Sequence, residues 1–270
     1  MYRLIAIDLD DTMFETESEL PSENLEALRP LDRAGVHVVL ASGRPTPAVA
    51  RTARLIIEAD RPHYIISYNG AIVSEVETGR EIKRHGVAME AAAELFRYAR
   101  EHGLLAQYYH DDEFFVETPD PRAESYHEAS GLPYRTVGPL EEFMDRESPK
   151  ILFQGTPAEL PRHLDDLRAR SAGRWHVTMS KPHFLELLNP AVNKGRSLSE
   201  LVDYLGLQRG EVVAVGDSLN DAEMLREAGL GVAVANARDE LKAEADLVTE
   251  RSAAEGGVAE AVRRLFPNVS

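Results

Sequence analysis

The feature that most constrains the fold is a set of short apolar runs, each ending directly in a cluster of polar residues. The runs are rich in β-branched side chains and do not alternate between apolar and polar positions. Such runs are typical of strands buried on both faces, as in a parallel sheet. The runs with their clusters are 4–7 before Asp8 to Thr12, 36–41 before Ser42-Gly43-Arg44, 64–66 before Ser67 to Gly70, and 212–215 before Gly216 to Asp221.

Helical patterns separate these runs. In the segment that begins near Ser22, the leucines recur on one face, Ser22 is the expected N-cap and Gly35 the expected end. Pro30 lies inside this pattern and predicts a kink or an early stop. Alternating strands and helices predict an α/β fold with a doubly wound, mostly parallel, Rossmann-like sheet, in which ligands bind beyond the carboxyl ends of the strands. All four polar clusters lie at those ends.

The middle of the chain has a different pattern, which predicts a separate α+β unit inserted into the sheet domain. We therefore expect a core of residues 1–83 plus 186–270 and an inserted cap of residues 84–185. A long loop is expected at 118–133, which holds three prolines. The other expected elements are helices 90–102 and 157–170, a hairpin 106–117 that turns at Asp111-Asp112, and strands 150–154, 175–180 and 183–188.

Charge and composition exclude several classes of function. The formal net charge is -16, which opposes binding to nucleic acid and to anionic membranes at long range. No apolar run approaches the roughly 20 residues of a membrane span, so we expect a cytoplasmic protein. The absence of cysteine excludes disulfides, thiolate nucleophiles and zinc sites built from cysteine. If so acidic a protein binds an anionic ligand, it needs a local positive site, such as a metal ion or a lysine.

Two acidic pairs are candidates for that chemistry. Asp8 and Asp10, two residues apart at a strand end, project to the same side, and two adjacent carboxylates require a cation or a shared proton. Asp217 and Asp221 form the second pair, and oxygen-rich sites of this kind suit magnesium. Each pair alone has an ordinary explanation as well, because acidic turns and N-caps are common before helices.

Two further segments are candidates for holding an anion. Lys194 lies just before an expected helix, where its charge opposes the helix dipole, and a nearby anion would explain it. Ser42-Gly43-Arg44 offers a hydroxyl and backbone amides after a buried strand, which can cradle a phosphate. A solvated loop lysine and an ordinary strand-to-helix turn are the plain alternatives for these two segments.

In their order along the chain, these motifs resemble those of the haloacid dehalogenase superfamily, and more narrowly its Cof-type phosphatases, which carry a large α+β cap of the C2 type. The resemblance covers both ends of the chain, and the middle matches only in size, position and α+β character. Asp11, Met13 and Ser42 depart from the usual glycine, leucine and threonine without removing a required functional group. The motifs are Asp8-Leu9-Asp10-Asp11-Thr12, Ser42-Gly43-Arg44, Asn69-Gly70-Ala71, Lys194-Gly195, Gly216-Asp217-Ser218-Leu219-Asn220-Asp221, Ala245-Asp246-Leu247-Val248-Thr249 and Gly256-Gly257-Val258.

The resemblance implies Mg²⁺-dependent hydrolysis of a small phosphomonoester, such as a sugar phosphate. It implies that Asp8 attacks phosphorus to form an aspartyl-phosphate, and that Asp10 acts as general acid and then as base. Further roles follow from the same resemblance. Mg²⁺ would be held by Asp8, the Asp10 backbone carbonyl and Asp217, with Asp221 as ligand or support. The phosphoryl group would be held by Ser42, Gly43, Lys194 and Asn220. The candidate substrate contacts are Arg44 and Asn69.

Three other functions remain open on the sequence alone. A phosphomutase of the phosphomannomutase type has a related cap, and it would yield an isomer with little free phosphate. A response-regulator receiver needs only about half this length, so the large insertion argues against it. An inactive scaffold that acts as a binding protein would show no metal-dependent hydrolysis.

Overall fold

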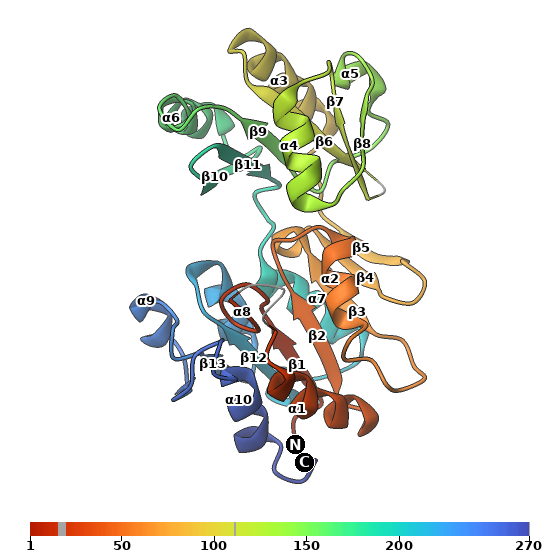
Figure 1. The fold of residues 1–270 in the computed structure, drawn as a ribbon, viewed down its shortest axis with the longest axis vertical. Coiled ribbons are helices and arrows are strands. Elements are labelled where there is room, and N and C mark those ends of the chain that lie inside the picture. Colours follow the sequence, from red (N-terminus) through yellow and green to blue (C-terminus); the bar gives the residue numbers. More distant parts are fainter. Residues whose placement is uncertain (16–19, 111, 270) are drawn as a thin grey trace. The chain divides into compact units, whose positions relative to one another are not determined.

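The computed structural model describes residues 1–15, 20–110 and 112–269. Contacts divide the chain into two compact units, Met1–Lys83 with Asn193–Ser270 and Arg84–Val192 (Figure 1). The expected boundary after residue 185 falls inside strand β11 (Phe184–Leu188), so the second unit extends farther than the sequence indicated. That the units act as a catalytic core and a cap stays a prediction.

The first unit is built on an eight-stranded sheet in the order β14-β13-β12-β1-β2-β3-β4-β5. The pairings from β14 through β3 are parallel, and β4 is antiparallel to β3. All residues of β1 and β12 are buried, as expected for central strands covered on both faces. The strands are β1 (Leu4–Ile7), β2 (His37–Ala41), β3 (Tyr64–Ser67), β4 (Ile72–Glu75), β5 (Glu81–Arg84), β12 (Val212–Gly216), β13 (Leu230–Ala233) and β14 (Leu247–Val248).

Helices connect these strands and cover the sheet, so the predicted α/β class is confirmed (Figure 1). Helix α1 packs against α10, and α7 packs against α8. The helices of this unit are α1 (Ser22–Arg33), α2 (Thr46–Ala53), α7 (Lys194–Tyr204), α8 (Ala222–Glu227), α9 (Asp239–Lys242) and α10 (Gly257–Leu265).

Helix α1 corrects two expectations about its start and end. Pro21 holds the N-cap position without a side-chain hydrogen bond, and Ser22 is the first helical residue. The helix also continues past Pro30 to Arg33, so the early stop predicted at the proline is wrong. Packing outweighs the lost hydrogen bond, because two leucines on the core face, one on each side of the proline, are fully buried. Gly35 has a φ of 85° and follows the end of the helix, as predicted.

The second unit contains a six-stranded sheet in the order β10-β11-β9-β6-β7-β8. All its pairings are antiparallel except that of β7 with β8. The strands are β6 (Leu105–His110), β7 (Glu113–Val116), β8 (Tyr134–Thr136), β9 (Ile151–Gln154), β10 (His176–Lys181) and β11 (Phe184–Leu188). The helices are α3 (Met89–Glu101), α4 (Pro121–Ser130), α5 (Leu140–Phe143) and α6 (Leu160–Ser171).

Helix α4 lies where the sequence predicted a long loop at 118–133. Three local signals explain the helix. Asp120 is its N-cap and accepts a hydrogen bond from the backbone N–H of Arg122, Pro121 takes the first helical position, and Gly131 ends the helix with a φ of 70°. Pro121 therefore marks the start of a helix. The expected hairpin forms from β6 and β7, but Asp111 of its turn lies outside the described residues.

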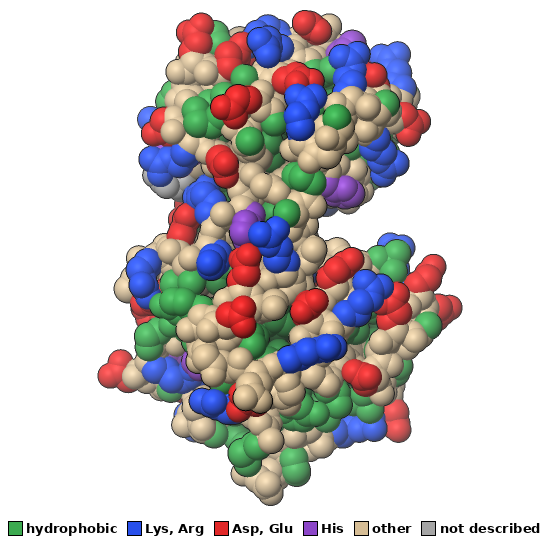
Figure 2. Space-filling view, turned by 180° about the vertical axis from the view of Figure 1, so that it is seen from behind, with side chains coloured by type: hydrophobic (Ala, Val, Ile, Leu, Met, Phe, Trp, Pro, Cys, Tyr) green, Lys and Arg blue, Asp and Glu red, His purple; other side chains and the backbone are tan. Residues whose placement is uncertain are grey.

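Charged side chains of both signs are interspersed on the face drawn in Figure 2, with red and blue residues mixed over each unit. A mixed surface of this kind differs from the clustered basic face typical of nucleic-acid-binding proteins. Among the helices that the structure describes, none is long and apolar enough to cross a membrane.

Candidate active site

Asp8 and Asp217 follow the carboxyl ends of the adjacent parallel strands β1 and β12. The backbone N–H of Asp8 donates to the carbonyl of Val215 at 3.0 Å, which continues the strand pairing by one residue. Because the register aligns Ile7 with Val215, the two aspartates leave the sheet at the same edge. The predicted meeting of polar clusters at strand ends thus holds for the two acidic clusters.

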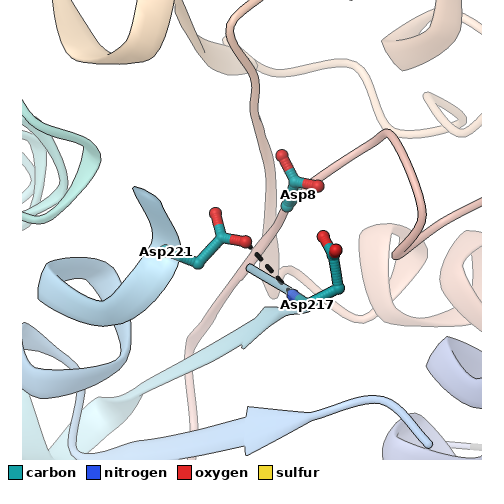
Figure 3. Close-up of side chains that lie close together, drawn as sticks. All are labelled: Asp8, Asp217 and Asp221. Atoms are coloured by element: carbon teal, nitrogen blue, oxygen red, sulfur yellow. Dashed lines mark hydrogen bonds between the residues drawn. The ribbon is translucent and has the colours of Figure 1, made fainter. Parts of the chain in front are cut away.

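The carboxyl groups of Asp8, Asp217 and Asp221 converge at this edge (Figure 3). One oxygen from each lies within 4.8 Å of the others. Burial, followed by the charge of Asp221, raises the pKa of Asp217 to about 6. Burial also raises the pKa of Asp8 well above its ordinary value, although Lys194 opposes that rise. Carboxyl groups held together at such cost are the usual setting for a bound cation.

Lys194 is the first residue of α7, and its side chain is only 1% exposed. Its Nζ donates to Asp8 Oδ1 at 2.5 Å and to Asp221 Oδ1 at 2.7 Å. Burial by itself would lower the pKa of Lys194, but the charges of Asp221 and Asp8 raise it above the ordinary value. These two carboxylates are the anions that the sequence required to explain a lysine at a helix N-terminus.

Asp221 and Asp217 differ in how many of their oxygens are already bonded. Asp221 is fully buried; its Oδ1 accepts from Lys194, and its Oδ2 accepts from the backbone N–H groups of Asp217 and Ser218. Asp217 Oδ1 accepts from the hydroxyl of Thr12 at 3.0 Å. The arrangement leaves Asp217 and Asp8 better placed than Asp221 to hold a metal ion.

Thr12 is a site residue that the sequence reasoning missed. Its side chain is fully buried, and its hydroxyl orients the carboxylate of Asp217. The available signal was a hydroxyl inside the first polar cluster, four residues after Asp8. Nothing in the spacing identified its partner, which lies 205 positions away.

A metal ion with oxygen ligands fits this set of residues. The three carboxylates and one ammonium group carry a formal charge of −2 when all are ionised, which matches a divalent cation. Every side-chain donor in the cluster is a carboxylate oxygen, as Mg²⁺ prefers, and no sulfur or imidazole ligand is among them. The donor chemistry therefore agrees with the expected cofactor.

Asp10 lies two residues after Asp8, and its carboxylate is bound by Arg44. Nε of Arg44 donates to both carboxylate oxygens, at 3.1 and 3.0 Å, and its NH2 group donates to Oδ1 at 2.6 Å. The Arg44 guanidinium also lies over the ring of Phe14, 5.2 Å from its centroid. Arg44 was a candidate substrate contact, but in the structure its partner is Asp10, and a two-point contact fixes the carboxylate plane.

Ser42 and Gly43 follow strand β2, the other neighbour of β1. Ser42 is fully buried, and its hydroxyl oxygen accepts from the backbone N–H of Arg44 at 3.1 Å. Asn69 follows β3 and donates its backbone N–H to the carbonyl of Ser42 at 3.0 Å. Asn220 Nδ2 donates to Asn69 Oδ1 at 3.3 Å, so the clusters after β2, β3 and β12 are in contact with one another.

Comparison with known proteins identifies relatives over nearly the whole chain. Residues 5–262 match the family model of haloacid dehalogenase-like hydrolases. YxeH of Bacillus subtilis, named as a candidate phosphatase, is 31% identical and covers 98% of both chains. The HMP-PP phosphatase of Klebsiella pneumoniae is 30% identical over 90% of this chain and 88% of its own. A haloacid dehalogenase-like hydrolase from Bacteroides thetaiotaomicron has a TM-score of 0.90 and 32% identity, covering 98% of this chain and 100% of its own.

Proposed function

The chain belongs to the haloacid dehalogenase-like hydrolases, with relatives that are named phosphatases, and on this premise we propose that it hydrolyses a small phosphomonoester with Asp8 as nucleophile and Mg²⁺ as cofactor. The observation that carries the proposal is the buried contact of Lys194 with Asp8 and Asp221, beside Asp217. A carboxylate nucleophile needs a fixed direction of attack and a positive environment for the phosphoryl group. Lys194 orients the Asp8 oxygen, and the lysine together with a Mg²⁺ ion held by the acidic residues would supply the positive environment.

In the first step, an oxygen of Asp8 attacks phosphorus while the bond to the leaving oxygen breaks. Asp10 gives its proton to that oxygen, and the alcohol leaves, so that Asp8 carries the phosphoryl group. In the second step, Asp10 takes a proton from water as the water oxygen attacks the same phosphorus. Inorganic phosphate leaves, the Asp8 carboxylate is restored and Asp10 is protonated again. General acid–base help of this kind contributes roughly 10²- to 10⁴-fold.

The remaining side chains bind and orient. Asp8 and Asp217, with the backbone carbonyl of Asp10, would hold Mg²⁺, and Asp221 would orient Lys194. When bound, Mg²⁺ supplies charge stabilisation to the phosphoryl oxygens. Arg44 holds the carboxylate plane of Asp10.

Four residues would bind the phosphoryl oxygens themselves. Ser42 would donate its hydroxyl, Gly43 its backbone N–H, Lys194 its ammonium group and Asn220 its amide. This set includes the local positive charge that an anionic substrate needs in a protein with a net charge of -16.

The names of the relatives support a substrate class. The Klebsiella pneumoniae relative is named for a small phosphorylated metabolite, HMP-PP. We propose that this chain likewise acts on a small phosphorylated metabolite in the cytoplasm. The mixed charges on the face drawn in Figure 2 give no support to a nucleic-acid substrate.

The test is phosphate release from a panel of small phosphomonoesters that includes a chromogenic aryl phosphate. Wild type with Mg²⁺, wild type with EDTA, and Asp8→Asn with Mg²⁺ are compared, and Asp60→Asn, which changes an exposed aspartate, is the matched control. We expect turnover only in wild type and Asp60→Asn, and only with Mg²⁺. Equal turnover by Asp8→Asn would show that another group attacks phosphorus, and an isomer without free phosphate would indicate a mutase.

A further inference from the structure

A strained turn follows strand β3 at the edge of the candidate site. Tyr68, Asn69 and Gly70 have φ values of 51°, 58° and 103°, so three consecutive residues take left-handed or related conformations. Residues with a Cβ atom rarely adopt this region, and they keep it only when their surroundings hold them there. Such strain commonly marks a position where function sets the geometry.

Backbone hydrogen bonds hold the turn against the Ser42-Gly43-Arg44 loop. The N–H of Tyr68 donates to the carbonyl of Arg44, and the N–H of Asn69 donates to the carbonyl of Ser42, both at 3.0 Å. Tyr68 is 3% exposed, which keeps its ring packed in the protein. Two backbone hydrogen bonds therefore fix the position of the turn relative to the loop that is expected to bind phosphate.

Helix α7 holds the other side of the turn. The hydroxyl of Ser197 donates to the carbonyl of Gly70 at 2.6 Å. A Cβ atom at Gly70 would lie 2.4 Å from the backbone oxygen of Asn193, which is the N-cap of the helix that begins at Lys194. No larger residue fits there without moving one of these segments. The turn is thus fixed between the loop after β2 and the start of α7.

The side chain of Asn69 ends a directed chain of hydrogen bonds. Ser218 Oγ donates to Asn220 Oδ1 at 2.6 Å, and Asn220 Nδ2 donates to Asn69 Oδ1 at 3.3 Å. Both amide oxygens are thereby used as acceptors. The NH2 group of Asn69 remains at the end of the chain, where it can act only as a hydrogen-bond donor.

The position of this NH2 group relative to Gly43 supports a ligand role. A Cβ atom placed on Gly43 would lie 3.1 Å from Nδ2 and 3.0 Å from Oδ1 of Asn69, so the amide lies directly beside that glycine. The amide therefore lies on the side of Gly43 where a side chain would stand, and the glycine leaves that side open. A phosphoryl oxygen there would accept a hydrogen bond from the Asn69 nitrogen, for which the described residues provide no acceptor.

We propose that Asn69 is a phosphate-binding residue whose NH2 group is aimed by Asn220 and by the strained turn at a phosphoryl oxygen beside Gly43. The inference rests on the proposed phosphatase function; it assigns Asn69, a candidate substrate contact from the sequence, to the phosphoryl group and names Asn220 as the residue that orients it. The plain alternative is that Asn69 only tolerates the left-handed backbone and links two loops. The two roles differ in their effect on phosphate affinity.

Two substitutions separate these roles. Asn69→Asp keeps the shape of the side chain, its tolerance of positive φ and an oxygen that accepts from Asn220, but it replaces the donor with an acceptor. Asn69→Gly removes the side chain and relieves the backbone strain. Asn268→Asp, at an exposed position in the C-terminal segment, controls for the added charge.

The readouts are the inhibition constant of inorganic phosphate against an aryl phosphate and the calorimetric affinity for inorganic phosphate, both with Mg²⁺. A lost hydrogen bond to a charged group corresponds to roughly 10- to 100-fold in affinity. We expect both Asn69 variants to weaken phosphate binding by about that factor, with Tm within a few degrees of wild type, and Asn268→Asp to leave affinity unchanged.

Three outcomes would overturn the proposal. If Asn69→Gly binds phosphate as wild type does, the side chain is not a ligand. If only Asn69→Asp binds more weakly, charge repulsion explains the effect and the donor role is wrong. If wild type neither hydrolyses phosphomonoesters nor binds inorganic phosphate, the proposed function fails together with this inference, whereas active wild type with unaffected variants refutes the inference alone.

Discussion

The raised pKa of Asp217 predicts that Asp217→Asn stabilises the protein when no metal is present. Burial and the charge of Asp221 raise this pKa from 3.8 to about 6. The folded state therefore binds the proton more tightly than the unfolded state does. The stability that this protonation contributes is fully present below pH 3.8 and is lost as the pH rises through 6. Asparagine is neutral at every pH, so Asp217→Asn does not lose this stability as the pH rises.

The magnitude follows from the size of the shift. A rise of about two pKa units corresponds to a ceiling of about 3 kcal/mol at 1.36 kcal/mol per unit. Asp217 retains 9% exposure at the edge of the sheet, and solvent and counter-ions reduce the effect to about 1–2 kcal/mol. Since about 1 kcal/mol shifts Tm by about 2–4 °C in a chain of this size, we expect Asp217→Asn to melt about 2–8 °C higher at pH 8.

The assay is thermal unfolding in EDTA at pH 5, 6, 7 and 8, with exposed Asp60→Asn as the matched control. The gap between Asp217→Asn and wild type should be about half of its full size at pH 5 and largest at pH 8. Mg²⁺ at millimolar concentration should then stabilise wild type more than Asp217→Asn, because the variant lacks a proposed ligand. An equal gap at every pH, or a less stable variant at pH 8 in EDTA, would refute the reasoning.

Three further predictions concern stability. Lys194→Met leaves two buried carboxylates without their shared cation and should cost about 3–5 kcal/mol in urea unfolding; a cost below about 1 kcal/mol would contradict the buried pairing. Burial and a neighbouring guanidinium lower the pKa of His37 to about 4. The unfolded state therefore binds a proton before the folded state does, and the free energy of unfolding should fall as the pH drops from 6.5 towards 4. His37→Gln should flatten that part of the stability profile, and an unchanged profile would show that another group titrates. Gly70→Ala should lower the free energy of unfolding by at least about 1 kcal/mol more than Gly35→Ala does. Both glycines have positive φ, but only at Gly70 would a Cβ atom lie against Asn193. Equal losses in urea unfolding would exclude that clash.

Much of the fold followed from local signals. The apolar runs without alternation predicted β1, β2, β3 and β12, and the sheet is mostly parallel, as expected. The resemblance to the haloacid dehalogenase superfamily and its phosphatases is confirmed by the family match and the named relatives. Helix α4 was missed because its prolines were interpreted as loop residues, although Asp120 and Gly131 provide both caps.

In the candidate site, the sequence predicted several of the residues but not most of their contacts. Asp8, Lys194, Asp217 and Asp221 are candidates from the sequence, and the structure brings their side chains close together. The pairing of Asp10 with Arg44, the hydroxyl of Thr12 on Asp217 and the chain from Ser218 through Asn220 to Asn69 were not predicted. Each of these contacts joins residues on different loops, and sequence spacing says nothing about which donor reaches which acceptor.

By itself the sequence determined where the polar clusters lie, because a buried strand and the polar residues at its end form a continuous local pattern. It also determined which chemical groups are available, since three aspartates and a lysine allow oxygen ligation of a divalent cation. Only the tertiary structure decided the partners. Lys194 and Asp8 are 186 positions apart, and their 2.5 Å contact depends on strand register and on where α7 begins, which are set by packing across the whole sheet.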